Sequence, residues 1–419
     1  MSKVPGSVWM RQRLNAKAEA IRDLADELTL RLLERTEAPI TAHQGYVCVD
    51  IDTFAMDQPA GRRTPRSGGP ERSEGFGAAE HNSGTNKEEV KRTYQGFDGY
   101  TPIAGYIGNE GWNIGLELRP GSQHSARETE YFYERLFPRI ERLTQADPPV
   151  LMREDSGFDS ARLLFAKAEE RDRLAQRGRS FDFLTKWNPR KQDTASWVER
   201  AEAANAFVET RPGKRVGLLS LEVERSWKQG KRPFRLIVQV TERTIDKKRQ
   251  PLLMPSIELE GWWTSLAVAA EDVIALYKHH GTHEQFHSEL FGFAESFASL
   301  RTSTPCCPAP FGLVKTDLDL ERLPSGKFDT NDALLHLAAF AYNCLHLFGP
   351  LGLTGEIAPI RHPAKRRRIK TVLQEIMDRA AKFVAHARRL VLDFGRDVAA
   401  HVEVFVALQN RLLAAAAAG

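Results

Sequence analysis

Residues 46–54 read YVCVDIDTF, a short apolar run that holds two aspartates, and the fold class follows from this stretch. β-Branched and aromatic residues that alternate with polar ones are typical of a strand. Because side chains two apart on a strand point to one face, Asp50 and Asp52 share that face. Burying two neighbouring carboxylates is costly and raises the pKa of each, so a divalent metal is a natural partner. The stretch therefore predicts a metal-binding strand, with Asp50 or Asp52 as its ligand.

The segments that follow predict strands and helices in alternation. Residues 100–107 and 112–119 are two β-type runs around the turn at 108–111, which indicates a hairpin. Further apolar patterns predict a helix, a buried strand, a second helix and another strand, at residues 125–143, 149–153, 160–177 and 181–188. The order strand, hairpin, helix, strand, helix, strand is that of an α/β protein and resembles a ribonuclease-H-like core.

Two further acids have positions that suit metal binding. Asp155 directly follows the predicted strand at 149–153, and Glu284 lies in the helical stretch 267–290. Together with Asp52, these carboxylates can converge on two divalent metals, and two metals about 3.5–4 Å apart suit in-line displacement at phosphorus. The pattern predicts a nuclease-like phosphoryl-transfer enzyme acting on DNA.

The rest of the chain divides by composition. After residue 195, β-rich runs such as FRLIVQVTE replace the earlier alternation, which predicts an insertion that interrupts the core. Residues 58–81 are rich in Gly, Pro, Ser and Arg and are expected to form a mobile loop. We predict a helical N-terminal segment, a first core part, a β-rich insertion, a second core part with the third acid, and a basic helical C-terminal region, at residues 1–44, 45–194, 195–260, 261–348 and 349–419.

Composition narrows the class of protein. Of the 419 residues, 42% are hydrophobic and 27% are charged, which is typical of a globular protein. No run approaches the ~18 apolar residues of a membrane span, and the N-terminus lacks an apolar signal core, so we expect a cytoplasmic protein. The cysteines have no metal-ligand or redox spacing and are expected to be reduced thiols: Cys48, Cys306, Cys307 and Cys344.

A basic run favours nucleic-acid binding more than the net charge does. The net charge of +4 is only compatible with such binding. Residues 361–370, RHPAKRRRIK, hold six Lys or Arg, enough for several phosphate contacts. A solvated linker is the alternative explanation. The predicted DNA contacts in this run are Lys365, Arg366, Arg367 and Arg368.

From about residue 45 to 400 the sequence resembles DDE transposases of bacterial insertion sequences, of the type whose third acid lies in a Tyr-(2)-Arg-(3)-Glu-(6)-Lys signature. Besides the acids, the resemblance rests on residues 82–85 (NSGT), 92–100 (RTYQGFDGY), 118–124 (LRPGSQH) and 323–328 (LPSGKF). The ordered set is specific, whereas any single piece is weak.

The resemblance implies cut-and-paste excision of a mobile element, with a DNA hairpin as intermediate. It implies two Mg²⁺ ions, or Mn²⁺, at Asp52, Asp155 and Glu284, with Asp52 favoured over Asp50 because the family shows an Asp before Thr at the strand end. The implied partners are the terminal inverted repeats and target DNA, bound by a homodimer in the bacterial nucleoid. The candidate DNA contacts are Tyr277, His280 and Lys315, and Arg119 together with His124. The alternatives are a packed aromatic on an amphipathic helix for Tyr277 and loop packing for Arg119 and His124.

Two departures from the signature leave a second interpretation open. His280 stands where the family has Arg, and Phe291 stands where it has Lys. Lys315 opens KTDLDLERLPSGKF, and 315 − 291 = 24, so residues 291–314 look like an insert. Residues 58–81 are also 24 long (81 − 58 + 1). An insert directly behind the catalytic helix can disable an enzyme, so the alternative is an inactive remnant that only binds DNA.

Two motifs have rival explanations. The stretch His283-Glu284-Gln285-Phe286-His287 matches the HExxH of zinc peptidases, whose Glu is a general base. No third-ligand motif follows it, and a peptidase leaves the other two acids unexplained. The tandem Trp262-Trp263 closes the β-rich insertion, where related enzymes stack a flipped base. A paired Trp is more often a core element.

Overall fold

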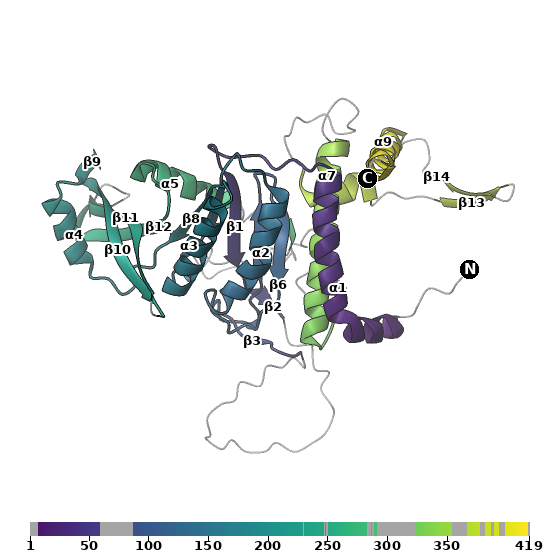
Figure 1. Cartoon of the computed structure of the whole chain (residues 1–419), viewed down its shortest axis with the longest axis horizontal. Helices are drawn as coiled ribbons and strands as arrows, with labels where there is room; N and C mark the ends of the chain where they lie inside the picture. Colours follow the sequence, from purple (N-terminus) through teal and green to yellow (C-terminus); the bar gives the residue numbers. More distant parts are fainter. Residues whose placement is uncertain are drawn as a thin grey trace, which may run out of the picture.

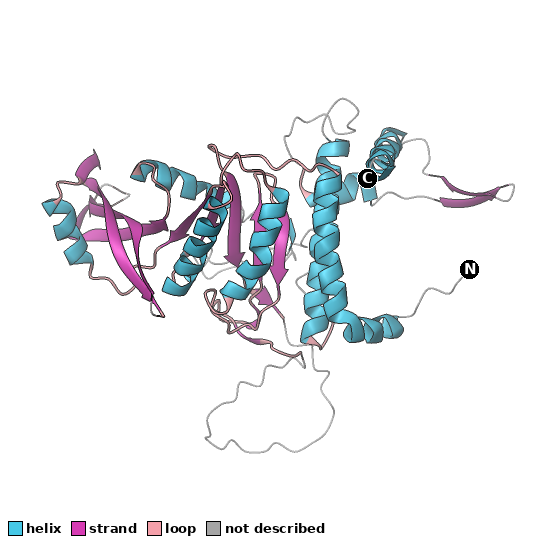
Figure 2. Cartoon of the chain, in the orientation of Figure 1, coloured by secondary structure: helices cyan, strands magenta, loops and turns pink. Residues whose placement is uncertain are grey.

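The computed structural model describes residues 7–58, 87–228, 230–246, 248, 250–282, 286, 289–290, 323–353, 367–377, 382–386, 389–393 and 399–417. Figure 1 shows a central sheet with helices on its faces and two long helices, α1 and α7, along one end. Figure 2 separates the same elements by type, with helices in cyan and strands in magenta.

The central layer is a mixed sheet of nine strands in the order β6-β5-β1-β7-β8-β12-β11-β10-β9. Strand β1 pairs in parallel with β7, which pairs in parallel with β8, while the other neighbours are antiparallel. The first five strands are β1 (Val47–Thr53), β5 (Ile103–Ile107), β6 (Trp112–Glu117), β7 (Val150–Glu154) and β8 (Phe181–Lys186). The α/β class and the predicted hairpin are confirmed.

The two faces of the sheet are covered by different helices. Helices α2 (Thr129–Leu143) and α3 (Ala161–Ala175) cover one face, where Val49 and Ile51 of β1 join the largest apolar cluster. Helix α5 (Ala270–Lys278) packs on the other face, against Leu151 and Leu184. Because side chains alternate along a strand, Asp50 and Asp52 of β1 lie on the face that α5 covers.

The β-rich stretch continues the same sheet. Helix α4 (Thr194–Ala203), capped by Asp193, leads into β9 (Phe207–Arg211), β10 (Lys214–Trp227), β11 (Gly230–Ile245) and β12 (Pro251–Thr264). The last three residues of β12 pair with β8, from Trp262 opposite Lys186 to Thr264 opposite Leu184. After β8 the chain therefore passes through α4 to the far edge of the sheet at β9 and returns strand by strand to β12 beside β8, which brings it to α5.

Helix α7 (Phe328–Leu353) covers the outer edge of the sheet at β6. Asn343 bonds both the N–H and the C=O of Asn113, at 3.0 and 2.7 Å, and Asp332 accepts from the N–H of Leu118 at 2.8 Å. These side chains satisfy edge groups that a further strand would otherwise bind. Within the described part of the chain, α7 alone is long and apolar enough to cross a membrane, by length and composition only, and half of its apolar window is buried.

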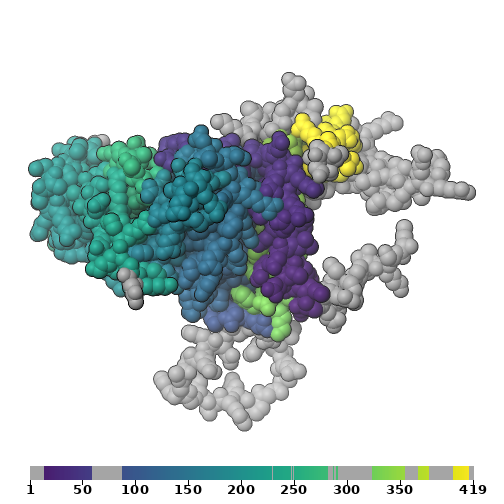
Figure 3. All heavy atoms as spheres, in the orientation of Figure 1, coloured from purple at the N-terminus to yellow at the C-terminus, as the bar shows by residue number. Residues whose placement is uncertain are grey.

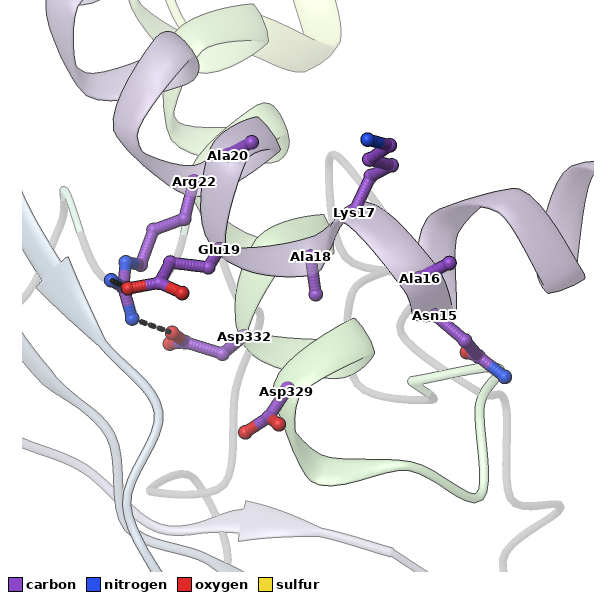
Figure 4. A pocket seen from close by; sticks show the side chains of 9 residues that line it. All are labelled: Asn15, Ala16, Lys17, Ala18, Glu19, Ala20, Arg22, Asp329 and Asp332. Atoms are coloured by element: carbon purple, nitrogen blue, oxygen red, sulfur yellow. Dashed lines mark ion pairs between the residues drawn. The ribbon is translucent and has the colours of Figure 1, made fainter.

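Helix α1 (Ser7–Arg35) runs beside α7 and bends at Lys17, where φ is −131° and ψ is 16°. The space-filling view shows its C-terminal part, in purple, lying against the central body (Figure 3). At the bend is a cavity of about 550 Å³. Figure 4 shows Arg22 reaching towards Asp332 there, and the two groups are 3.8 Å apart. The ion pair ties the bend of α1 to the start of α7.

A small second sheet is formed by β2 (Met56–Asp57), β4 (Asp98–Tyr100) and β3 (Lys91–Arg92). The C-terminal region is not wholly helical, and this corrects the sequence-based expectation. After α8 (Ile369–Val372) and a π-helical turn (Leu373–Met377), strands β13 (Lys382–His386) and β14 (Arg389–Asp393) form a hairpin before α9 (Ala399–Ala417). Residues with strong strand preference, Val384 and Val391, pair in that hairpin, and this preference outweighs the helical spacing.

Two predicted inserts fall largely or wholly outside the described residues. Of the loop predicted at 58–81 only Gln58 is described, and none of 291–314 is. Helix α1 lies within the helical N-terminal segment predicted at residues 1–44, and α7 extends past residue 348, where the second core part was predicted to end.

Candidate active site

The pairing of β1 with β7 brings two of the predicted acids to one edge of the sheet. The strands are parallel, and Asp50 pairs with Arg153 and Ile51 with Glu154. The next position in that register sets Asp52 level with Asp155. Both side chains are half-buried. Ligands of open α/β sheets bind outside the carboxyl ends of parallel strands, which is where these two carboxylates lie.

Backbone N–H groups orient each carboxylate. Thr53 N–H donates to Oδ1 of Asp52 at 2.7 Å, and Gly157 N–H donates to Oδ1 of Asp155 at 2.8 Å. Asp155 thereby caps the short helix at Ser156–Phe158. A side chain at position 157 would come within 2.8 Å of Ser125 Oγ and 2.9 Å of Asp155 Oδ1, so the close turn requires glycine there.

Tyr277, from the last turn of α5, faces the same acids. Burial and the negative charges of Asp155, Asp52 and Asp50 raise the pKa of the Tyr277 phenol well above its usual value. Its ring packs on Trp262, with ring centroids 6.0 Å apart. The phenol therefore stays protonated and can donate a hydrogen bond at any physiological pH. Its predicted DNA contact remains a proposal.

Asp50 occupies a different environment, in a buried ion pair. Arg153 donates to both carboxylate oxygens of Asp50 at 2.7 Å, and Nδ1 of His280 lies 2.8 Å from Oδ1. A third Arg153 nitrogen donates to the carbonyl of Leu276 at 2.8 Å, which ties α5 to the pair. Burial alone would raise the pKa of Asp50, but the charge of Arg153 and the hydrogen bond with His280 hold it well below its usual range.

These contacts argue against two predicted roles. The carboxylate of Asp50 is engaged by a bidentate guanidinium, which makes Asp52 the better candidate for the first metal ligand. His280 is 5% exposed and hydrogen-bonded to Asp50, so it supports α5 from within instead of contacting DNA. The smaller imidazole fits this enclosed position next to the strand, where the family signature has arginine.

Three other predicted contacts are enclosed. Arg119 is 1% exposed, and it donates hydrogen bonds to Glu117 at 2.7 Å and to the hydroxyl of Thr129 at 3.0 Å. Its guanidinium therefore holds the surrounding loop in place instead of reaching DNA. Trp262 and Trp263 are both buried, and the indole N–H of Trp263 donates to Asp159 at 2.9 Å. Neither indole is placed to stack a flipped base, and the core interpretation is the correct one.

Other candidates lie outside the described residues: Glu284, Lys315, Lys365 and Arg366, together with His283 and His287 of the peptidase motif. Of the basic run, Arg367 donates to the carbonyl of Leu353 at 2.9 Å, and Arg368 is mostly exposed, 3.9 Å from the buried Glu289. Arg367 thus closes the end of α7. Within the described ranges no three His, Cys, Asp or Glu side chains form a metal-binding group.

A groove of about 440 Å³ opens beside Asp155, and sequence reasoning did not predict it. Thr53 and Gly157 are among its lining residues, and we call this cavity the edge groove. Its polar and aromatic walls include Arg92, Tyr94, His124, Asn188 and Arg190. Two of the sequence motifs on which the resemblance rests, residues 92–100 and 118–124, supply lining residues of the groove, and they were the only hint of it in the sequence. That these two motifs meet the segment after β8 in space can be seen only in the folded chain.

Comparisons with known proteins gave similarities among solved structures but none among sequences. No family model matches the sequence, and no curated protein matches it. Among solved structures, the chain is similar to a cryo-EM structure of a piggyBac transposase synaptic complex with hairpin DNA, at 11% identity and a TM-score of 0.30. The match covers 78% of this chain and 50% of that chain, so this protein spans about half of its length. The proposals below rest on the residues of this chain.

Proposed function

We propose that this protein is a DDE-type transposase that cleaves and transfers DNA strands in a metal-dependent reaction. The observation that supports it is the meeting of Asp52 and Asp155 at the carboxyl edge of two paired parallel strands, beside a groove with basic walls. We further propose that it acts as a dimer on the terminal repeats of its element.

The strand order supports a ribonuclease-H-like core within this proposal. In that core a hairpin lies on one side of the first strand and two strands parallel to it lie on the other, as β6-β5-β1-β7-β8 do here. On this proposal, the β-rich stretch between β8 and α5 is an insertion, and the first acid ends the first strand.

The donor set fits a hard divalent cation. Asp52 and Asp155 offer carboxylate oxygens, which Mg²⁺ and Mn²⁺ prefer, and Glu284 would complete the set from the segment after α5. Each carboxylate is oriented in advance by a backbone N–H. Bound Mg²⁺ or Mn²⁺ supplies Lewis-acid chemistry and the generation of a nucleophile at phosphorus.

The residues of the chain then provide binding and orientation. Arg92 and Arg190 on the walls of the edge groove neutralise backbone phosphates, while His124 and Asn188 contribute polar contacts. The backbone N–H of Ala126 donates to Nδ1 of His124 at 3.2 Å, which places the proton of the neutral ring on Nε2 as a donor. Tyr277 holds its phenolic proton beside the acids and donates to an oxygen bound there.

The test is cleavage by the full chain of duplex DNA taken from the flanks of its gene, with Mg²⁺ or Mn²⁺. Asp155→Asn keeps the size and the capping oxygen but removes a charge, and we expect it to lower the cleavage rate by about 100-fold or more. Asp172→Asn is the matched control, because that carboxylate forms an exposed ion pair with Arg232 at 2.9 Å on α3. It should cut like the unmodified chain.

Two outcomes would overturn the proposal. Undiminished cutting by Asp155→Asn would remove the carboxylate from the chemistry. Duplex binding without cutting by the unmodified chain, under the same conditions, would instead favour the inactive DNA-binding remnant.

A further inference from the structure

We propose, on the basis of the proposed function, that Tyr94 is the residue on which an unpaired base of the DNA end stacks in the edge groove. Tyr94 lines this groove together with Asp155, and its side chain is 67% exposed. The two tryptophans expected to take this role are buried, at 3% and 1% exposure. The groove thus places an accessible aromatic ring beside one of the candidate catalytic acids.

The turn that carries Tyr94 is fixed by its own hydrogen bonds. Both the N–H and the hydroxyl of Thr93 donate to the carbonyl of Phe97, at 2.8 and 2.9 Å, and Gly96 N–H donates to the carbonyl of Thr93 at 3.0 Å. Gly96 adopts φ of +87°, which glycine accommodates without strain. Thr93 itself is buried. The backbone beneath the tyrosine is therefore preorganised, which lowers the entropic cost of binding.

Close packing also fixes the position of the turn relative to the acids. A side chain at Gly99 would overlap the carbonyl of Met56, and one at Gly121 would overlap the carbonyls of Gly99 and Lys91. Position 121 begins the loop to Ser125, whose hydroxyl lies 2.6 Å from that of Thr53, next to Asp52. The β3–β4 turn, this loop and the end of β1 are therefore packed directly against one another.

The chemistry of the walls indicates nucleic acid as the occupant. Arg92 and Arg190 are exposed cations that line the same groove as the ring and suit backbone phosphates, and Asn188 adds a polar side chain. An aromatic face accepts any base, because every base has a π-face. An exposed neutral ring in a groove that also carries cations therefore matches an unpaired nucleotide better than it matches an apolar protein surface. An unpaired base at the DNA end, next to the cleavage point, would require such an aromatic surface close to the catalytic acids.

The experiment measures DNA binding separately from cleavage. The probe is a duplex from the gene's flank with an unpaired 2-aminopurine at its end, mixed with the full chain in EDTA, so that no divalent metal supports cutting. Stacking on a ring quenches 2-aminopurine, and the titration gives the affinity. We expect Tyr94→Ala to lose the quenching and to bind about 10- to 100-fold more weakly.

Matched variants separate stacking from loss of fold. Tyr94→Phe keeps the ring and should retain quenching and affinity within about threefold. Tyr131→Ala removes another exposed tyrosine, on α2 and away from the groove lining, and should behave like the unmodified chain. Replacing Arg92 and Arg190 together by Gln should reduce the slope of log affinity against log salt by about 2.

Contrary results would be specific. Equal quenching by Tyr94→Ala and the unmodified chain would overturn the stacking role, and this would hold even if Asp155-dependent cleavage is observed. A Tyr94→Ala variant that changes only the sedimentation of the protein would identify a contact between copies of the chain instead. Tyr94-dependent quenching without any cleavage would support the inference while the proposed transposase activity fails.

Discussion

Two neighbouring pairs of positions on strands β1 and β7 have opposite environments. Asp50 lies across from Arg153 and is buried in a bidentate ion pair. Two residues further along, Asp52 comes level with Asp155; both carboxylates are half-buried, and Asp155 lines the edge groove. The same residue type on the same face of one strand is thus structural in one place and a candidate metal ligand in the other. The two environments differ because the strand register places Arg153 opposite Asp50 and a second carboxylate, Asp155, opposite Asp52.

The buried pair also supports the edge pair. Arg153 joins β7 to Asp50 of β1 and to the carbonyl of Leu276 in α5, and His280 adds a second link from the turn after α5 to Asp50. The position of Tyr277 on α5 follows from these contacts. Each edge carboxylate accepts a hydrogen bond from a backbone N–H, and two neighbouring like charges favour binding of a cation.

The largest expected effect comes from breaking the buried pair. Arg153→Met leaves the Asp50 carboxylate buried with only His280 as a described partner, and we expect the free energy of unfolding to fall by about 3–5 kcal/mol. Urea denaturation followed by circular dichroism measures the change. Arg232→Met removes an exposed arginine partner of Asp172 and should cost less than about 1 kcal/mol. Equal losses for the two variants would contradict the distinction between buried and exposed pairs.

The pH dependence of stability sharpens the comparison further. The pKa of Asp50 is lower in the folded chain than in the unfolded chain, so its ion pair contributes stability above the unfolded value of about 4. That contribution is lost as the pH falls through the folded value. Asp50→Asn lacks the titrating group, so its stability difference from the unmodified chain should shrink by about 2 kcal/mol between neutral pH and strongly acidic pH.

Urea midpoints measured across this range for both proteins provide the test. A difference that stays constant with pH would mean that the ion pair contributes nothing to folding. His280 and Arg153 both face Asp50, and the Asp50→Asn variant removes the coupling to each of them at once.

The sequence predicted the local elements well and their cross-strand partners poorly. The alternating pattern at 46–54 and the apolar run at 149–153 located β1 and β7, and Asp155 was identified because it follows a strand. Nothing local, however, shows that Arg153 faces Asp50, because that contact depends on pairing between strands about 100 residues apart. The same limit hid the edge groove, whose lining residues come from five separate segments of the chain.

The C-terminal hairpin illustrates a different limit. Apolar residues at 382–393 fit a helical repeat, but the paired register of β13 with β14 uses Val384 and Val391, which prefer extended backbone. The local sequence pattern of this segment is therefore compatible with both a helix and a β-hairpin. In contrast, the buried tryptophans at 262 and 263 follow from a simple physical rule, since large aromatic side chains gain most from burial.

Manganese binding by the full chain tests the central comparison most directly. Titration calorimetry with Mn²⁺ would compare Asp52→Asn, Asp155→Asn, Asp50→Asn and the control Asp172→Asn, each verified as folded by circular dichroism. We predict that the two edge substitutions each weaken Mn²⁺ affinity by about tenfold or more, while Asp50→Asn and Asp172→Asn bind like the unmodified chain. Unchanged affinity in either edge variant, or a loss confined to Asp50→Asn, would contradict the assignment of the metal site to the strand edge.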